Sequence, residues 1–145
     1  MSLLLGLKNT ATQAVPAGSS IAFNGAYRKY CKKSCGMSTF SYTTNSVSLQ
    51  QSGIYHITIT LVGTGDAAGD VTVQLLEDGT LATFSTQTIT TPSTEIRTFV
   101  LDYYILVDSS TILNSSVVSP KTLTLINTGV DATFTSVVTN IEKVV

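Results

Sequence analysis

The sequence has no tryptophan, one histidine, two cysteines and three prolines among 145 residues, and only 12% of its residues are charged. One imidazole and two thiols are too few to complete a four-ligand zinc site within one chain. The longest apolar runs, Leu3–Leu5 and Tyr103–Val107, are much shorter than the roughly 18 residues that a membrane-spanning helix needs. We therefore expect no metal, no cofactor and no insertion into a membrane.

Hydroxylated and β-branched side chains are abundant instead. The chain contains 24 threonines and 17 serines, and threonine, valine and isoleucine together occupy 48 positions. A branched Cβ restricts χ1 and packs well on a pleated surface, so this composition favours strands. With 43% hydrophobic residues, the chain has enough apolar surface to fold rather than remain disordered. We expect a short N-terminal arm, residues 1–6, and a single domain, residues 7–145.

Apolar residues recur with period two from residue 39 onward, which predicts strands over 54–61, 71–75, 98–107, 122–126 and 132–141. Asp78-Gly79 is a strong hairpin signal, and Asn127-Thr128-Gly129 is expected to join the last two strands in a second hairpin. Short turns between seven or more strands predict an all-β, two-sheet antiparallel sandwich. The predicted core comprises Tyr55, Ile57, Ile59, Leu75, Leu101, Tyr103 and Leu125.

Charge is unevenly distributed although the net charge is −1. The first 65 residues contain five bases and no acid, whereas residues 66–145 contain nine acids and three bases. One interpretation is a solvated loop, and the other is a surface that attaches to an acidic or phosphate-rich partner. The chain as a whole is not basic enough for a typical nucleic-acid binder. The attachment candidates are Arg28, Lys29, Tyr30, Lys32 and Lys33.

Cys31 and Cys35 lie in the same basic segment, and their spacing matches neither a redox Cys-x-x-Cys motif nor half of a visible zinc site. A local disulfide is expected in an oxidising compartment, and free thiols are expected in a cytosol. The sequence leaves these two states open.

Catalytic motifs are missing or incomplete. Residues 63–68 formally fit Gly-x-Gly-x-x-Ala, but a strand follows them where a nucleotide site requires a helix. The only histidine, His56, lies within a strand, and no Gly-x-Ser-x-Gly elbow is present, so we expect a packed or interface residue. Asp102 alone interrupts an apolar strand, and we expect it to serve at an interface or to pair with Arg97 or Lys121. We expect no enzyme.

Several short motifs follow one another along the chain in a characteristic order. They are Leu7-Lys8-Asn9-Thr10, Val15-Pro16-Ala17-Gly18, Ile21-Ala22-Phe23-Asn24, Ser46-Val47-Ser48-Leu49, Gly53-Ile54-Tyr55-His56-Ile57, Val71 to Gly79 and Leu123-Thr124-Leu125-Ile126-Asn127. In this order they resemble the tumour-necrosis-factor-like jelly roll of complement-type globular heads, of the C-terminal heads of collagen-like exosporium glycoproteins and of phage surface proteins. The resemblance covers about residues 7–143. It implies a ten-strand jelly roll that assembles as a homotrimer around its inner sheet.

The resemblance also implies presentation or adhesion rather than catalysis. Two features depart from the family pattern: no collagen-like Gly-x-y repeat precedes the head, and Arg28–Cys35 is a basic insertion. We expect a bacteriophage virion-surface protein, a capsid decoration or head fibre bound to a capsid or other surface protein. The alternative is a receptor- or carbohydrate-binding head on a bacterial or spore surface, which would bind host-surface glycans through an exposed pocket containing Tyr27, Tyr30 or Tyr42. The trimer-interface candidates are His56, Thr58, Thr60, Asp102 and Tyr104.

Overall fold

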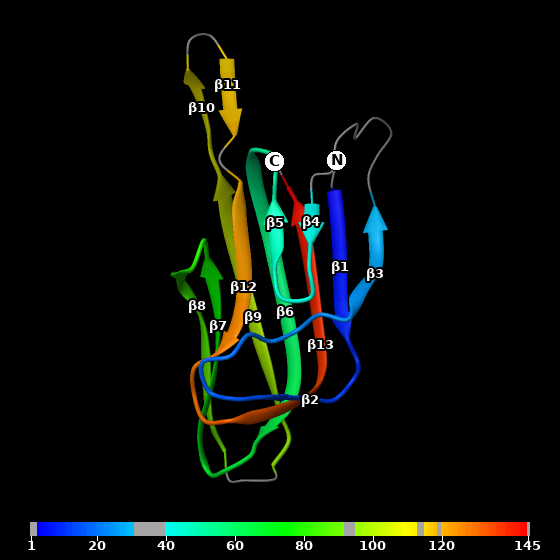
Figure 1. The fold of residues 1–145 in the computed structure, drawn as a ribbon, viewed down its shortest axis with the longest axis vertical. Coiled ribbons are helices and arrows are strands. Elements are labelled where there is room, and N and C mark those ends of the chain that lie inside the picture. Colours follow the sequence, from blue (N-terminus) through cyan, green and yellow to red (C-terminus); the bar gives the residue numbers. More distant parts are fainter. Residues whose placement is uncertain (1–2, 31–39, 92–94, 113–114, 119, 145) are drawn as a thin grey trace.

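The structure is a computed structural model that describes residues 3–30, 40–91, 95–112, 115–118 and 120–144. These residues form an antiparallel sandwich of two main sheets with a separate hairpin at one end (Figure 1). Sheet 1 has the strand order β3-β1-β13-β6-β9, with β2 paired to β13. Sheet 2 has the order β4-β5-β12-β7-β8. The all-β, two-sheet prediction is confirmed.

The chain crosses between the two sheets several times. Sheet 1 consists of β1 (Leu3–Asn9), β2 (Gln13–Val15), β3 (Gly25–Tyr30), β6 (Gly53–Gly65), β9 (Arg97–Val107) and β13 (Ala132–Lys143). Sheet 2 consists of β4 (Phe40–Tyr42), β5 (Val47–Leu49), β7 (Gly69–Glu77), β8 (Thr80–Thr91) and β12 (Lys121–Asn127). The hairpin consists of β10 (Ser109–Ile112) and β11 (Ser115–Val118). Because the apolar faces of the two sheets pack against each other, one core lies between the two layers.

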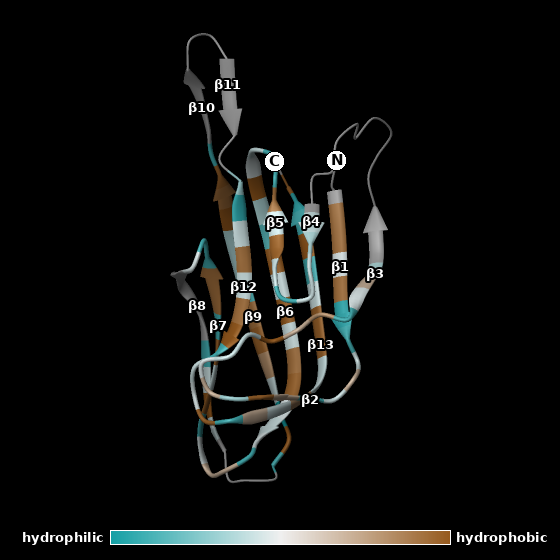
Figure 2. Cartoon of the chain, viewed as in Figure 1, coloured by the Kyte–Doolittle hydropathy of each residue, from teal (hydrophilic) through white to brown (hydrophobic). Residues whose placement is uncertain are grey.

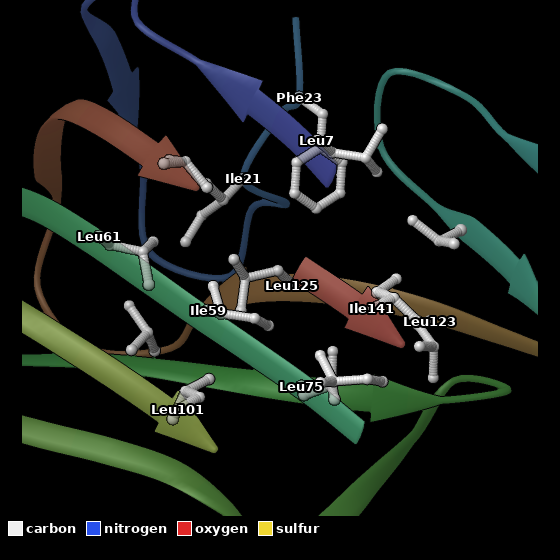
Figure 3. Packing of buried hydrophobic residues seen from close by; sticks show 14 of the residues in the cluster. Leu7, Ile21, Phe23, Ile59, Leu61, Leu75, Leu101, Leu123, Leu125 and Ile141 are labelled. Atoms are coloured by element: carbon white, nitrogen blue, oxygen red, sulfur yellow. The ribbon is translucent and has the colours of Figure 1, made fainter. Parts of the chain in front are cut away.

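Strand β6 shows how the sequence pattern produces this core. Its odd-numbered positions from Tyr55 to Leu61 are buried, and the even-numbered positions between them are only half-buried. Figure 2 shows the same alternation of hydropathy along β6, and Figure 3 shows Ile59 and Leu61 facing the core. Six predicted core residues are at most 4% exposed, and Tyr103 packs against them partly buried. The predicted strand phase is therefore confirmed.

The turn between β7 and β8 also follows the sequence prediction. Asp78 and Gly79 have φ angles of 52° and 81°, the left-handed conformation that a two-residue hairpin turn of type I′ requires at both central positions. Asp78 is fixed further by Thr122, whose amide donates a 2.8 Å hydrogen bond to its carboxylate.

The second predicted hairpin is wrong. β12 pairs with β5 and β7 in sheet 2, whereas β13 pairs with β1, β2 and β6 in sheet 1. The buried Asn127 side chain holds the connection between the sheets, because its amide nitrogen donates to the carbonyls of Val15 and Val130 and its oxygen accepts from the Gly129 amide. The Asn-Thr-Gly turn therefore carries the chain from one layer to the other.

The N-terminal segment is part of sheet 1 from Leu3 onward. β1 pairs with β13 on one side and with β3 on the other, and Leu5 and Leu7 are fully buried. Residues 3–6, which were expected to form an arm, thus contribute to the sheet and its core. Residues 63–65 end β6 and residues 66–68 lead directly into β7 with no helix between them, so the nucleotide motif lacks the element it needs. Among the described residues there is no helix long and apolar enough to cross a membrane.

Candidate functional site

The predicted interface residues lie together on the surface of sheet 1 that faces away from the core, which we call the outer face of sheet 1. In the β6–β9 ladder, His56 pairs with Tyr104, Thr58 with Asp102 and Thr60 with Val100. Directly paired residues of neighbouring strands point to the same side of a sheet. The outer face of sheet 1 comprises His56, Thr58 and Thr60 of β6, Val100, Asp102, Tyr104 and Leu106 of β9, and Val138, Asn140 and Glu142 of β13.

Strand β9 places large apolar side chains on this face. Val100, Tyr104 and Leu106 are 48%, 61% and 51% exposed. β9 is the last strand of sheet 1, and exposed apolar side chains on an edge strand are unusual because they invite association with another chain. This strand is the strongest indication in the described residues of a surface that another molecule covers.

The outward surface of sheet 2 has a different chemistry. It presents mainly threonine and other polar side chains, and the hydroxyls of Thr72 and Thr88 form a 2.9 Å hydrogen bond across β7 and β8. Thr90 similarly donates to the carboxylate of Asp70. A surface whose polar groups are paired with one another or with water gains little from being covered. The two layers therefore differ in their tendency to associate, and sheet 1 is the apolar one.

A histidine–carboxylate pair lies within the outer face of sheet 1. The Nε2 atom of His56 is 2.5 Å from Oδ1 of Asp102, and the His56 ring stacks on Tyr104 with 4.5 Å between ring centroids. Asp102 therefore does form the expected cross-strand contact, but the predicted partners are wrong. The partner of Arg97 is Glu95, and Lys121 lies 3.5 Å from Glu77.

The His56 imidazole contacts a carboxylate and an aromatic ring on an open sheet surface. Within the described ranges no group of three or more histidine, cysteine, aspartate or glutamate side chains is placed to hold a metal ion.

The basic segment begins in strand β3. Arg28, Lys29 and Tyr30 are the last residues of β3, where Arg28 pairs with Gly6 and Lys29 with Leu5 of β1. Lys32 and Lys33 lie outside the described residues, as do both cysteines. The first half of the predicted attachment segment is therefore an edge strand of sheet 1 rather than a loop.

Sequence reasoning missed Val100 and Leu106. The signal was present, because Phe99–Leu101 and Tyr103–Val107 are apolar at both phases of the strand alternation. Such a strand is typical of burial on both sides. The side chains on one side of β9 pack in the core. The apolar side chains on its other side indicate a second surface that covers them.

No protein-family model and no curated protein matches this sequence. Its structure is similar to solved structures over nearly the whole chain. The globular domain of zebrafish complement 1qA matches with a TM-score of 0.63 and 8% identity, covering 95% of this chain and 94% of that one. The tumour necrosis factor Eiger from S. frugiperda matches with a TM-score of 0.62 and 11% identity, covering 100% and 92%.

Murine APRIL gives a TM-score of 0.60 at 9% identity, with 99% of this chain and 100% of that chain covered. The chain therefore has the jelly-roll fold of tumour-necrosis-factor-like and complement-type globular heads, as its ordered motifs indicated. At these identities the similarity concerns the fold alone.

Proposed function

We propose that this protein is a non-enzymatic homotrimeric head that attaches to a surface, and that its protomers associate through the outer face of sheet 1. The observation that carries the proposal is the exposed apolar series Val100, Tyr104 and Leu106 on edge strand β9. The resemblance implies that a further copy of the chain covers this face.

The composition of the face supports self-association. The charged side chains that it presents on β6, β9 and β13 are Asp102 and Glu142, and His56 already contacts Asp102. On β1 the exposed Lys8, which pairs with Val138, adds one positive charge. Interface centres are depleted in charge and enriched in aromatic residues such as Tyr104. Covering this face would remove apolar surface from water while desolvating few charges.

The test compares two lysine substitutions at exposed positions on opposite layers. Val100→Lys adds a charge to the outer face of sheet 1, and Thr122→Lys adds one to the outward surface of sheet 2. Size exclusion with light scattering should give three chain masses for the wild type and for Thr122→Lys, and 15.3 kDa for Val100→Lys. A wild-type monomer at micromolar concentration, or a trimeric Val100→Lys variant, contradicts the proposal.

We further propose that the surface to which the trimer attaches belongs to a virion, where the protein serves as a capsid decoration or head fibre. The virion assignment rests on the sequence resemblance, and the basic segment that follows from β3 is the proposed contact. β3 ends at the same end of the molecule as the β10–β11 hairpin (Figure 1). Arg28 is in register with Gly6 of β1 and Asn140 of β13, so the basic segment begins at the edge of the outer face of sheet 1 that is opposite β9.

Replacing Arg28, Lys29, Lys32 and Lys33 by serine should leave the trimer intact and weaken its binding to purified phage particles. Added salt should have the same effect on the wild type, because exposed charges are screened within about 10 Å at 0.1 M ionic strength. Binding that is insensitive to both changes excludes the basic segment as the contact. Absence of the protein from purified particles excludes the virion role.

The second candidate function is a carbohydrate-binding head on a bacterial or spore surface. One observation favours it: the ring of Tyr42 is exposed beside a small cavity. A glycan array probed with the trimer tests this function, and the absence of any bound glycan excludes it.

A further inference from the structure

A cavity of about 210 Å³ opens where the edge strands β3 and β4 leave the two sheets. Its lining consists of Phe23, Asn24 and Gly25, which lead into β3, and of Tyr42, Thr43 and Thr44, which lead out of β4. No lining residue carries a charge. The cavity is smaller than the roughly 300 to 1,000 Å³ of sites for drug-sized ligands, so it suits one small unit of a larger ligand.

The backbone around the cavity is held by hydrogen bonds. The Phe23 amide donates to the Thr44 carbonyl at 2.7 Å, and the Asn24 amide donates to the Lys8 carbonyl at 2.7 Å. The Thr43 hydroxyl forms a 2.9 Å hydrogen bond with the Ser46 hydroxyl and accepts the Ser46 amide at 3.1 Å. The bond from Phe23 to Thr44 links the segment before β3 to the turn after β4. A site fixed in this way loses little entropy on binding.

The chemistry of the lining combines apolar and polar surfaces. Phe23 is only 6% exposed and belongs to the core, where Figure 3 shows its ring near Leu7, and Tyr42 is 40% exposed at the rim. In the part of the chain that the structure describes, the side chains of Asn24 and Thr44 make no hydrogen bond within the protein. Together they offer an amide with donors and an acceptor, and a hydroxyl that can act as either.

We propose that this cavity binds one neutral pyranose unit of a glycan, with the apolar C–H face of the sugar against Tyr42 and its hydroxyls toward Asn24 and Thr44. A pyranose presents an apolar face and an edge of hydroxyl groups, which matches an aromatic ring beside uncharged polar groups. An acidic sugar would find no cation in the lining. This inference rests on the second candidate function and supplies the site and ligand class for it; the trimer proposal is independent of it.

The test uses saturation-transfer NMR on the full chain with the methyl glycosides of glucose, galactose, mannose and N-acetylglucosamine, and with N-acetylneuraminic acid as the charged comparison. At least one neutral glycoside should bind, with a Kd on the order of 1 mM, typical of a ligand of this size. The saturation should be strongest on ring C–H protons of one sugar face.

Tyr42→Ala should weaken binding about tenfold, and Asn24→Ala should also weaken it, whereas Tyr42→Phe should retain most of the affinity. The matched control is Tyr27→Ala, because Tyr27 is 38% exposed but does not line the cavity. Each variant is checked for an unchanged melting temperature.

Three results would overturn the inference: no binding of any neutral glycoside, binding of the acidic sugar alone, or equal binding by wild type and Tyr42→Ala. If the glycan array shows a bound glycan whose binding is unchanged in Tyr42→Ala, the carbohydrate-binding function stands and this site is wrong. If no glycan binds, both are wrong.

Discussion

His56 contacts Asp102 diagonally across the β6–β9 ladder, with 2.5 Å between Nε2 and Oδ1, while its ring stacks on Tyr104, its direct cross-strand neighbour. The His56 side chain is 29% exposed and that of Asp102 is 61% exposed. A histidine–carboxylate contact with so much solvent exposure contributes little to the stability of one protomer, since water competes for both groups. The same pair placed inside an interface would be desolvated and would be costly to break.

A double-mutant cycle with His56→Gln and Asp102→Asn measures this difference. In a Val100→Lys background, where the protein is expected to be monomeric, the coupling free energy from urea denaturation should be below about 1 kcal/mol. In the trimer the coupling should be larger. Equal coupling in the two backgrounds would show that assembly does not cover the pair.

Ile57→Ala tests the core. Ile57 is 1% exposed on the inner phase of β6, so its truncation should destabilise the fold by about 2 to 5 kcal/mol through lost burial and a residual cavity. Thr44→Ala, at an exposed turn position, should cost under about 0.5 kcal/mol. Equal urea midpoints for the two variants would contradict the placement of Ile57 on the core-facing side of β6.

Thr139→Val should stabilise the protein. Thr139 is 2% exposed and lies between Leu7 and Ile59 in sheet 1, and in the described residues its hydroxyl has no hydrogen-bond partner. Valine has nearly the same shape and removes the desolvated hydroxyl, so the free energy of unfolding should rise by about 1 kcal/mol. Thr133→Val is the control, because that hydroxyl donates to Asp66 at 2.7 Å and its loss should not be favourable. A destabilised Thr139→Val variant would show that the hydroxyl has a partner.

Tyr55 should make the fold sensitive to alkali. Burial raises the pKa of its phenol from 10.0 to about 12, because the low-dielectric core disfavours the phenolate. The neutral form is thus favoured in the native state. The raised pKa of Tyr55 contributes fully to the free energy of unfolding below pH 10, and this contribution is lost as the pH rises from 10 to 12.

The measurement is chemical denaturation of the wild type and Tyr55→Phe across that range. The stability difference between the two proteins should change in favour of Tyr55→Phe as the pH rises. Tyr55→Phe also loses the 2.7 Å hydrogen bond to the Gln51 carbonyl, which sets a constant offset at lower pH. A difference that is independent of pH between 9 and 12 would contradict the cited shift.

The sequence predicted those features that depend on neighbouring residues. The alternation around Ile57 and Ile59 reports burial directly, because successive side chains of a strand point to opposite faces. Asp78 and Gly79 determine their own turn through their backbone preferences.

Features that depend on the placement of distant strands were missed. The Asn127 turn looks local, but the pairing of β12 with β7 and of β13 with β6 separates the strands that it joins. The contact of Asp102 with His56 needs the register between β6 and β9, which no local pattern contains. The cavity beside Tyr42 likewise arises from segments of different sheets.

The central position of β13 in sheet 1 has a consequence during synthesis. The ladders β1–β3 and β6–β9 join residues that emerge early from the ribosome, yet β13, which lies between them, is translated after all the other strands. Both ladders must therefore wait for residues 132–143 with unpaired edges, a state in which nascent chains are prone to aggregate. Completion of sheet 1 is thus a late step in folding, and its many non-local contacts favour folding in milliseconds to seconds rather than microseconds.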